Sequence, residues 1–212
     1  MTETFHYFGL YTRGEAIRMV LTHAGANWTD NRVAQADWPA LKSSMPGGQM
    51  PCLELADGTK LGQSMAILRF LGHRHGYYPQ DAMEIYHVEN ILSLYDELIG
   101  TIYMPVIHSW YGKGEDVIAE ATDKIFTQSL PKFLEGVSSY VSGDGWAVGG
   151  KMTIADFIIG HIWVSFINSS SVGYGVDRFA EVRANNPHYA AYGARFEAEM
   201  AAYLGSRPAC PI

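Results

Sequence analysis

The chain has 212 residues, 48% of them hydrophobic, which is enough to bury a sizeable core in one or two domains. Its net charge is −7, yet residues 1–80 carry 7 Lys and Arg against 6 Asp and Glu, while residues 81–212 carry 8 against 16. An acidic chain without a basic stripe is a poor nucleic-acid binder, and no run of about eighteen apolar residues predicts a membrane span. A small anion is therefore best sought in residues 1–80.

The first residues and the cysteines bear on the cellular setting. The stretch MTETFHYFGLYTRGE has neither the basic nor the apolar region of a secretory signal. Cys52 and Cys210 form no CxxC pair and lack metal-ligand spacing, so we expect no metal site. A reduced, cytoplasmic setting is expected.

Residues 1–76 alternate between strand and helix patterns. In chain order they predict a strand, a helix, a second strand, a short helix, two strands joined by an Ala-Asp-Gly corner, and a helix. These elements are expected at residues 4–8, 13–23, 27–33, 37–44, 51–55, 59–62 and from 64 onward. The order βαβ followed by ββα predicts a thioredoxin-like α/β domain.

Residues 77–82 are interpreted as a linker, and residues 83–204 as an all-α domain. Apolar residues at helical spacing predict a long first helix, from Ile85 to Ile102. A second helix is expected over residues 115–141, kinked at Pro131. A third begins at Thr153, where Thr-Ile-Ala-Asp has the form of a capping box.

Gln63 and Ser64, in GQSMAILRFLG, stand where a short strand gives way to a helix. A helix N-terminus offers unpaired N–H groups and a partial positive charge, which attract a carboxylate. The serine hydroxyl and the glutamine amide would complete a site for the ammonium and carboxylate of an amino acid. From these two residues alone, the simpler interpretation is an N-cap serine beside an exposed glutamine.

The neighbouring residues favour a ligand. A cis Met50–Pro51 bond would turn the polar groups of Met50 outward to a peptide, although only about 5–6% of X–Pro bonds are cis. Trp38 and Lys42 share one face of a short helix and would suit a second carboxylate. A core tryptophan beside a solvated lysine is the alternative for that pair. Together these features indicate a small, extended, anionic peptide.

The sequence resembles the cytosolic glutathione S-transferases, most closely the sigma class and its mu, pi and alpha relatives. Four stretches carry the resemblance, which covers essentially the whole chain: YFGLYTRGEAIR (7–18), QADWPALKSSMPGGQMPCLE (35–54), GQSMAILRFLG (62–72) and GGKMTIADF (149–157). The resemblance implies the glutathione transferase fold, with Tyr7 and Arg13 as catalytic residues. It implies glutathione binding by Tyr7, Phe8, Arg13, Trp38, Lys42, Gln49, Met50, Pro51, Gln63 and Ser64, with Pro51 at the family's cis-proline.

The implied chemistry requires a glutathione thiolate, because the thiol is a poor nucleophile. We predict that Tyr7 donates a hydrogen bond as a neutral phenol while Arg13 adds a favourable field. Thr12 is the rival, since it stands where serine-type transferases carry their activating group, and Tyr11 is a weaker one. Cys52 is expected to be a buried strand residue.

Two positions depart from the sigma pattern. Relatives of that class often carry an aspartate that reaches the partner subunit's glutathione, and the aligned residue here is Ser93, with Asp96 nearby. The acidic cluster of some sigma-class prostaglandin synthases is incomplete, with only Asp96 and Glu97, which again argues against a metal. The electrophile pocket is expected to use Phe8 and three residues of the first long helix: Tyr103, Met104 and Ile107.

The sequence thus predicts a cytoplasmic, homodimeric glutathione transferase that serves detoxification. Glutathione is its co-substrate, a small apolar electrophile is its other substrate, and no cofactor is expected. Three alternatives stay open: a glutathione-dependent prostaglandin D-type isomerase, a non-catalytic member of the lens-crystallin kind, and a carrier of apolar ligands.

Overall fold

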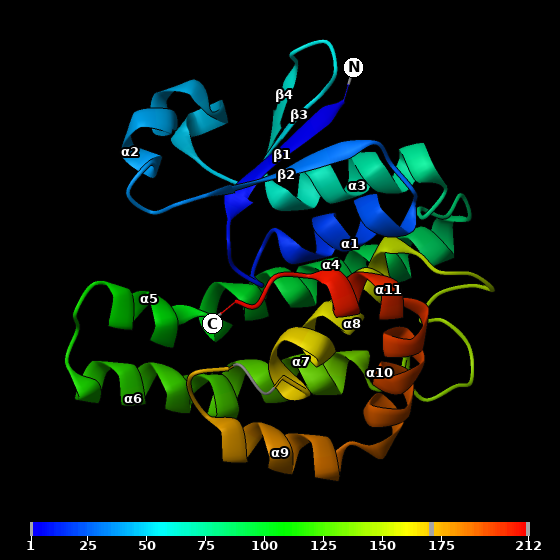
Figure 1. Ribbon diagram of the computed structural model, residues 1–212. Coiled ribbons are helices and arrows are strands. Elements are labelled where there is room, and N and C mark those ends of the chain that lie inside the picture. The colour runs from blue at the N-terminus through cyan, green and yellow to red at the C-terminus, as the bar shows by residue number, and fades with distance from the viewer. Residues whose placement is uncertain (1, 170–171, 211–212) are drawn as a thin grey trace.

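A four-stranded mixed sheet forms the N-terminal part of the computed structural model, which describes residues 2–169 and 172–210 (Figure 1). The strands are β1 (Glu3–Phe8), β2 (Trp28–Val33), β3 (Cys52–Glu54) and β4 (Lys60–Gly62). Their order is β2-β1-β3-β4, with β1 parallel to β2 and antiparallel to β3, and β3 antiparallel to β4. The predicted strands and hairpin are confirmed, and Tyr7, the predicted catalytic residue, is the second-to-last residue of the inner strand β1.

Helices cover this sheet. They are α1 (Glu15–His23), α2 (Trp38–Leu41) and α3 (Ser64–His75), with 3-10 turns at Lys42–Ser44 and Pro46–Gly48. Phe5 and Tyr7 alternate with less buried neighbours along β1, as expected for a strand with one face on the core. The sheet and its helices form the predicted thioredoxin-like domain.

The remainder of the described chain is helical. Its helices are α4 (Ala82–Ile102), α5 (Met104–Trp110), α6 (Glu115–Lys124), α7 (Leu130–Val137), α8 (Ile154–Ile162), α9 (Val176–Asn185), α10 (Pro187–Glu199) and α11 (Ala201–Ser206). None of the helices in residues 2–169 and 172–210 is long and apolar enough to cross a membrane. The helical part begins with α4 at Ala82 and ends with α11 at Ser206.

Two helix predictions were wrong in detail. The helix expected over residues 115–141 is interrupted by a π-helical segment, Ile125–Ser129, and ends at Val137. Pro131 has no N–H and its ring crowds the preceding turn, and the Leu130 N–H reaches back five residues to the Ile125 carbonyl. The first long helix stops at Ile102, so Met104 and Ile107 lie on a separate, unpredicted helix, α5, that has a proline in its first turn.

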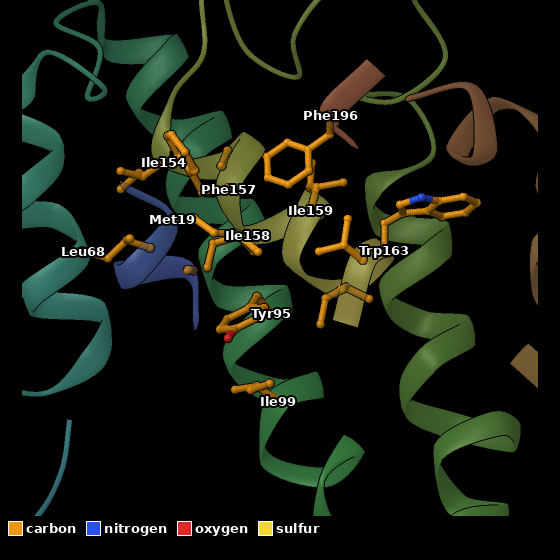
Figure 2. Close-up of a cluster of buried hydrophobic side chains, with 14 of the residues drawn as sticks. Met19, Leu68, Tyr95, Ile99, Ile154, Phe157, Ile158, Ile159, Trp163 and Phe196 are labelled. Carbon is orange, nitrogen blue, oxygen red and sulfur yellow. The ribbon is translucent and has the colours of Figure 1, made fainter. Parts of the chain in front are cut away.

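Helix α8 is the centre of the core, because every residue from Ile154 to Ile162 is buried. Figure 2 shows side chains of α8 reaching Met19 of α1 and Leu68 of α3 on one side. The predicted capping box is confirmed, with the Thr153 N–H donating to the buried Asp156 carboxylate at 2.6 Å. The two domains therefore share one packed core, which fixes the cavity between them.

Candidate active site

A cavity of about 840 Å³ lies where the end of β1 meets α2, the N-terminus of α3 and the helices α4 and α5. The structure brings together in its wall all ten residues expected to bind glutathione: Tyr7, Phe8, Arg13, Trp38, Lys42, Gln49, Met50, Pro51, Gln63 and Ser64. This volume is in the range of small-molecule sites. The wall therefore joins segments of the first domain that are up to 57 residues apart in the chain.

Tyr7 places a buried hydroxyl in the wall of the cavity. Its hydroxyl oxygen is 2.7 Å from the Thr12 hydroxyl oxygen, so the two rival residues are hydrogen-bonded to each other. Burial, only partly offset by the bond to Thr12, raises the pKa of Tyr7 to about 12. The phenol is therefore neutral at pH 7 and suited to donate a hydrogen bond.

Arg13 supplies positive charge beside this pair. It lies in the loop before α1, and its Nη1 donates to Asp96 Oδ1 of α4 at 2.6 Å. Burial opposes the charge, but hydrogen bonds to Asp96 and Tyr103 outweigh burial and raise the pKa of Arg13. Ser93 instead donates to the Glu89 carbonyl at 2.8 Å. Asp96 therefore lines this chain's own cavity, which the alignment at Ser93 does not indicate.

The corner between β4 and α3 has the expected form of an anion site. Gln63 is the N-cap and has a φ of 68°, a left-handed value uncommon for a residue with a side chain. Its amide donates to Gln49 Oε1 at 3.3 Å, and Ser64 is buried in the first turn of the helix. The Met50–Pro51 bond is cis, as the family pattern predicts. The N–H groups of the first turn of α3 thus open on a cavity lined by polar side chains.

The far end of the same wall carries the predicted aromatic and ammonium pair. Trp38 begins α2 and Lys42 begins the following 3-10 turn, and both line the cavity. The Trp38 ring packs edge-on to Phe8, with centroids 5.8 Å apart. Trp38 is half-buried and Lys42 exposed, so this pair is available to a second carboxylate.

The helical domain contributes aromatic and aliphatic side chains to the cavity. Tyr103 and Ile107 line it as expected, whereas Met104 is not among the lining residues. Trp110 and Tyr111, at the end of α5, line it without having been predicted and are 41% and 70% exposed. Pro105 is the sequence feature that could have indicated a new helix here, because a proline is favoured in the first turn of a helix. Trp110 and Tyr111 lie at the end of that helix and line the cavity.

The fold and the cavity place this chain among two-domain proteins that join a thioredoxin-like domain to an all-helical one. Family models for the glutathione S-transferase N-terminal and C-terminal domains match residues 3–73 and 102–207. Human hematopoietic prostaglandin D synthase is 32% identical over 151 residues, which are 71% of this chain and 72% of the relative. The class-mu 28 kDa glutathione S-transferase of Schistosoma mansoni is 26% identical over 97% of this chain and 96% of its own.

Solved structures agree. A glutathione S-transferase of Caenorhabditis elegans is 28% identical with a TM-score of 0.82, and covers 100% of this chain and 99% of its own. A monomeric glutathione S-transferase from the hookworm Necator americanus is 25% identical with a TM-score of 0.84, and covers 100% of both chains. The chain belongs to the glutathione S-transferase family, and the predicted class of enzyme, a glutathione transferase, is confirmed.

Proposed function

We propose that this glutathione transferase binds glutathione along the cavity wall formed by α2, the Met50–Pro51 segment and the N-terminus of α3. The amino-acid end of the γ-glutamyl group lies at Gln63 and Ser64, where the helix N-terminus and an amide suit its carboxylate and ammonium. The glycine carboxylate lies at Trp38 and Lys42. This arrangement directs the cysteine between the two ends, toward Tyr7.

The observation that carries the proposal is the buried Tyr7–Thr12 pair in the wall of this cavity. If Thr12 donates its proton to the phenol oxygen, the Tyr7 proton is free to bond the sulfur. A thiol pKa near 8.5 leaves only a few per cent of thiolate at pH 7, and lowering it by two units requires about 2.7 kcal/mol. One hydrogen bond to a charged group contributes about 1.5–3 kcal/mol, so Tyr7 supplies most of the shift.

Tyr7 acts as a donor and never as the base. A pKa of about 12 means that the phenolate is a negligible fraction at pH 7. The Arg13 guanidinium adds a favourable field, and its pair with Asp96 keeps it at the cavity wall. The thiolate then attacks a small apolar electrophile bound among Phe8, Tyr103, Ile107 and Trp110, and conjugation proceeds by addition or substitution.

The test is a pH titration of thiolate absorbance for bound glutathione in the wild type, Tyr7→Phe and Thr12→Ala. We expect a wild-type thiol pKa of about 6.5–7 and a value near 8.5 in Tyr7→Phe. Thr12→Ala should give an intermediate value, because the phenol keeps its proton but loses its fixed orientation. Loss of the thiolate in Thr12→Ala with full retention in Tyr7→Phe would transfer the catalytic role to Thr12.

A glutathione-dependent isomerase is the second candidate, favoured by the identity to human hematopoietic prostaglandin D synthase. It would use the same thiolate on an endoperoxide. Product analysis distinguishes the two reactions, because an isomerase regenerates glutathione whereas a transferase consumes it. A crystallin-like or carrier role would show binding without turnover, and the Tyr7–Thr12 pair argues against it.

We further propose that the protein belongs to the sigma class and acts in the cytoplasm as a homodimer. Its role is detoxification, and it works without a cofactor. Met83 and Tyr86 of α4 are apolar side chains 60% and 58% exposed, and a second copy would cover them. Sedimentation at micromolar concentration tests the dimer. A monomeric mass would instead make this chain like the hookworm protein in that respect.

A further inference from the structure

The C-terminal tail, residues 203–208, returns to the loop that carries the proposed thiol-activating groups. This β1–α1 loop, residues 9–14, contains Thr12 and Arg13. Figure 1 shows the C-terminal segment, in red, running between α1 and the helical domain toward the bend after β1. The Tyr11 hydroxyl donates to the Pro208 carbonyl, and the Arg207 guanidinium lies 4.1 Å from the centroid of the Tyr11 ring. Tail and loop are therefore in direct contact.

The tail also satisfies a buried carboxylate immediately after the loop. Glu15, the first residue of α1, is fully buried, and its Oε1 accepts hydrogen bonds from the Tyr203 hydroxyl at 2.8 Å and from Arg207 at 3.1 Å. A buried carboxylate without donors is costly. Arg18 also donates to this carboxylate, at the longer distance of 3.5 Å. Tyr203 and Arg207 of the tail thus hold the start of α1 in place.

The loop backbone is held at further points. Arg18 donates to the Phe8 carbonyl at 2.9 Å and to the Leu10 carbonyl at 3.0 Å. Nε2 of His161, on α8, is 3.0 Å from the Tyr11 carbonyl. Burial lowers the pKa of His161 to about 4, so at pH 7 the ring is neutral and its Nε2 carries the hydrogen. Every one of these ties leaves Thr12 and Arg13 themselves free to face the cavity.

Arg207 differs from the other residues that hold the loop, because it contacts residues on both sides of Thr12 and Arg13. Tyr11 precedes Thr12 and Arg13, and Glu15 follows them. The second nitrogen of the guanidinium donates to the Val164 carbonyl at 3.1 Å, which ties it to the helical domain. Arg207 does not line the cavity, so it would not touch bound glutathione.

We propose that Arg207 is a positioning residue for thiol activation, which fixes the β1–α1 loop so that the Thr12 hydroxyl keeps the Tyr7 proton directed at sulfur. The inference rests on the proposed function, because it acts through Tyr7 and Thr12. Loosening the tail then allows the loop to shift. The expected result is weaker thiolate formation with little change in glutathione affinity, since the residues proposed to hold the two ends of glutathione, at Trp38 and Lys42 and at Gln63 and Ser64, lie on other elements.

The test compares Arg207→Met with a matched control, Arg195→Met. Arg195 on α10 likewise donates to two backbone carbonyls, Gly143 and Gly145, and lies over the Tyr192 ring, but it does not line the cavity and makes no contact with the loop. For Arg207→Met we expect the thiol pKa of bound glutathione to rise by about one unit. At a pH below the thiol pKa of both the wild type and the variant, this is a tenfold loss of thiolate. The glutathione Kd should change less than twofold, and kcat should recover at high pH. Arg195→Met should leave the thiol pKa unchanged at a similar loss of Tm.

Two further variants make the result decisive. Arg207→Lys keeps a charge and a donor and should recover part of the shift, while Tyr203→Phe removes one donor to Glu15 and should cause a smaller shift in the same direction. A wild-type thiol pKa in both Arg207→Met and Tyr203→Phe, while Tyr7→Phe raises it, would overturn the positioning role alone. If Tyr7→Phe also leaves the thiol pKa unchanged, the proposed function itself fails.

Discussion

Replacing Gly14 with alanine should displace Tyr7, the proposed thiol-activating residue, without touching a polar group. A Cβ atom at Gly14 would lie 2.3 Å from Cδ1, 2.7 Å from Cγ and 2.9 Å from Cε1 of Tyr7. The backbone of Gly14 has φ −88° and ψ −15°, which alanine adopts without strain. The steric overlap with the ring is therefore the whole of the perturbation.

The size of the effect follows from how little room the ring has. Carbon atoms normally approach to about 3.5–4.0 Å, so three ring atoms would overlap the methyl group by roughly 1 Å. Tyr7 lies in the central strand and is only 6% exposed, so its ring must tilt or the start of α1 must move. Overpacking of this kind costs about 1–3 kcal/mol of stability. A misplacement of about 1 Å near the reacting atoms costs on the order of 100-fold in rate.

The assay is kcat/KM for conjugation of glutathione with an activated aryl chloride, together with the Tm. Gly9→Ala is the matched control, because Gly9 lies in the same loop and an added Cβ there would meet nothing within 4 Å. We expect a loss of about 100-fold for Gly14→Ala, as estimated for such a displacement, and about wild-type activity for Gly9→Ala. Equal activity in the two variants would refute the argument that Gly14 sets the ring position.

Two further predictions concern stability. Burial lowers the pKa of His161 from 6.5 to about 4, so its contribution to stability is complete above pH 6.5 and is lost as the pH falls toward 4. The full loss is about 3 kcal/mol, measured by urea unfolding across that range, and His161→Gln should remove this part of the pH dependence. Asp156 accepts from the backbone N–H groups of Ala147 and Thr153 and from the Tyr192 hydroxyl. Asp156→Asn would turn an N–H donor toward these donors and should lower the free energy of unfolding by about 3 kcal/mol. The control, Asp144→Asn at an exposed position, should change it very little. Similar losses in both variants would contradict this view of the capping box.

Local chemistry explains why much of the fold was predictable from sequence. The hairpin follows from its Ala-Asp-Gly corner, and the start of α8 follows from the spacing of Thr153 and Asp156. The cavity wall proposed to bind glutathione could be predicted because Gln63, Ser64 and the Met50–Pro51 pair each carry a signal within a few residues. A family resemblance then assembled them in one place.

What was missed depends on contacts between distant segments. A proline lies next to each of the two features that were missed, the π-helical segment before Pro131 and the separate helix α5. A proline can kink, widen or end a helix, and the packing around it decides which of these occurs. Gly14 shows no local pattern, and only the approach of the Tyr7 ring reveals why it is a glycine. The sequence treats Tyr7 and Thr12 as rivals for one role, and only the structure shows that their hydroxyls are hydrogen-bonded to each other.

The groups proposed to bind and to activate glutathione both lie in the thioredoxin-like domain, but the helical part of the chain supports only the activating loop. The residues suited to the ends of glutathione, from Trp38 to Ser64, all belong to the thioredoxin-like domain. The β1–α1 loop is held from within that domain by Arg18, but also by three residues of the helical part: Asp96 of α4, His161 of α8 and Arg207 of the tail. On the proposed mechanism, we therefore expect a change in the helical domain to alter the thiol pKa while leaving glutathione affinity intact. The same domain shapes the electrophile end through Tyr103 and Ile107, so electrophile binding and thiol activation are free to vary together while the glutathione wall stays constant.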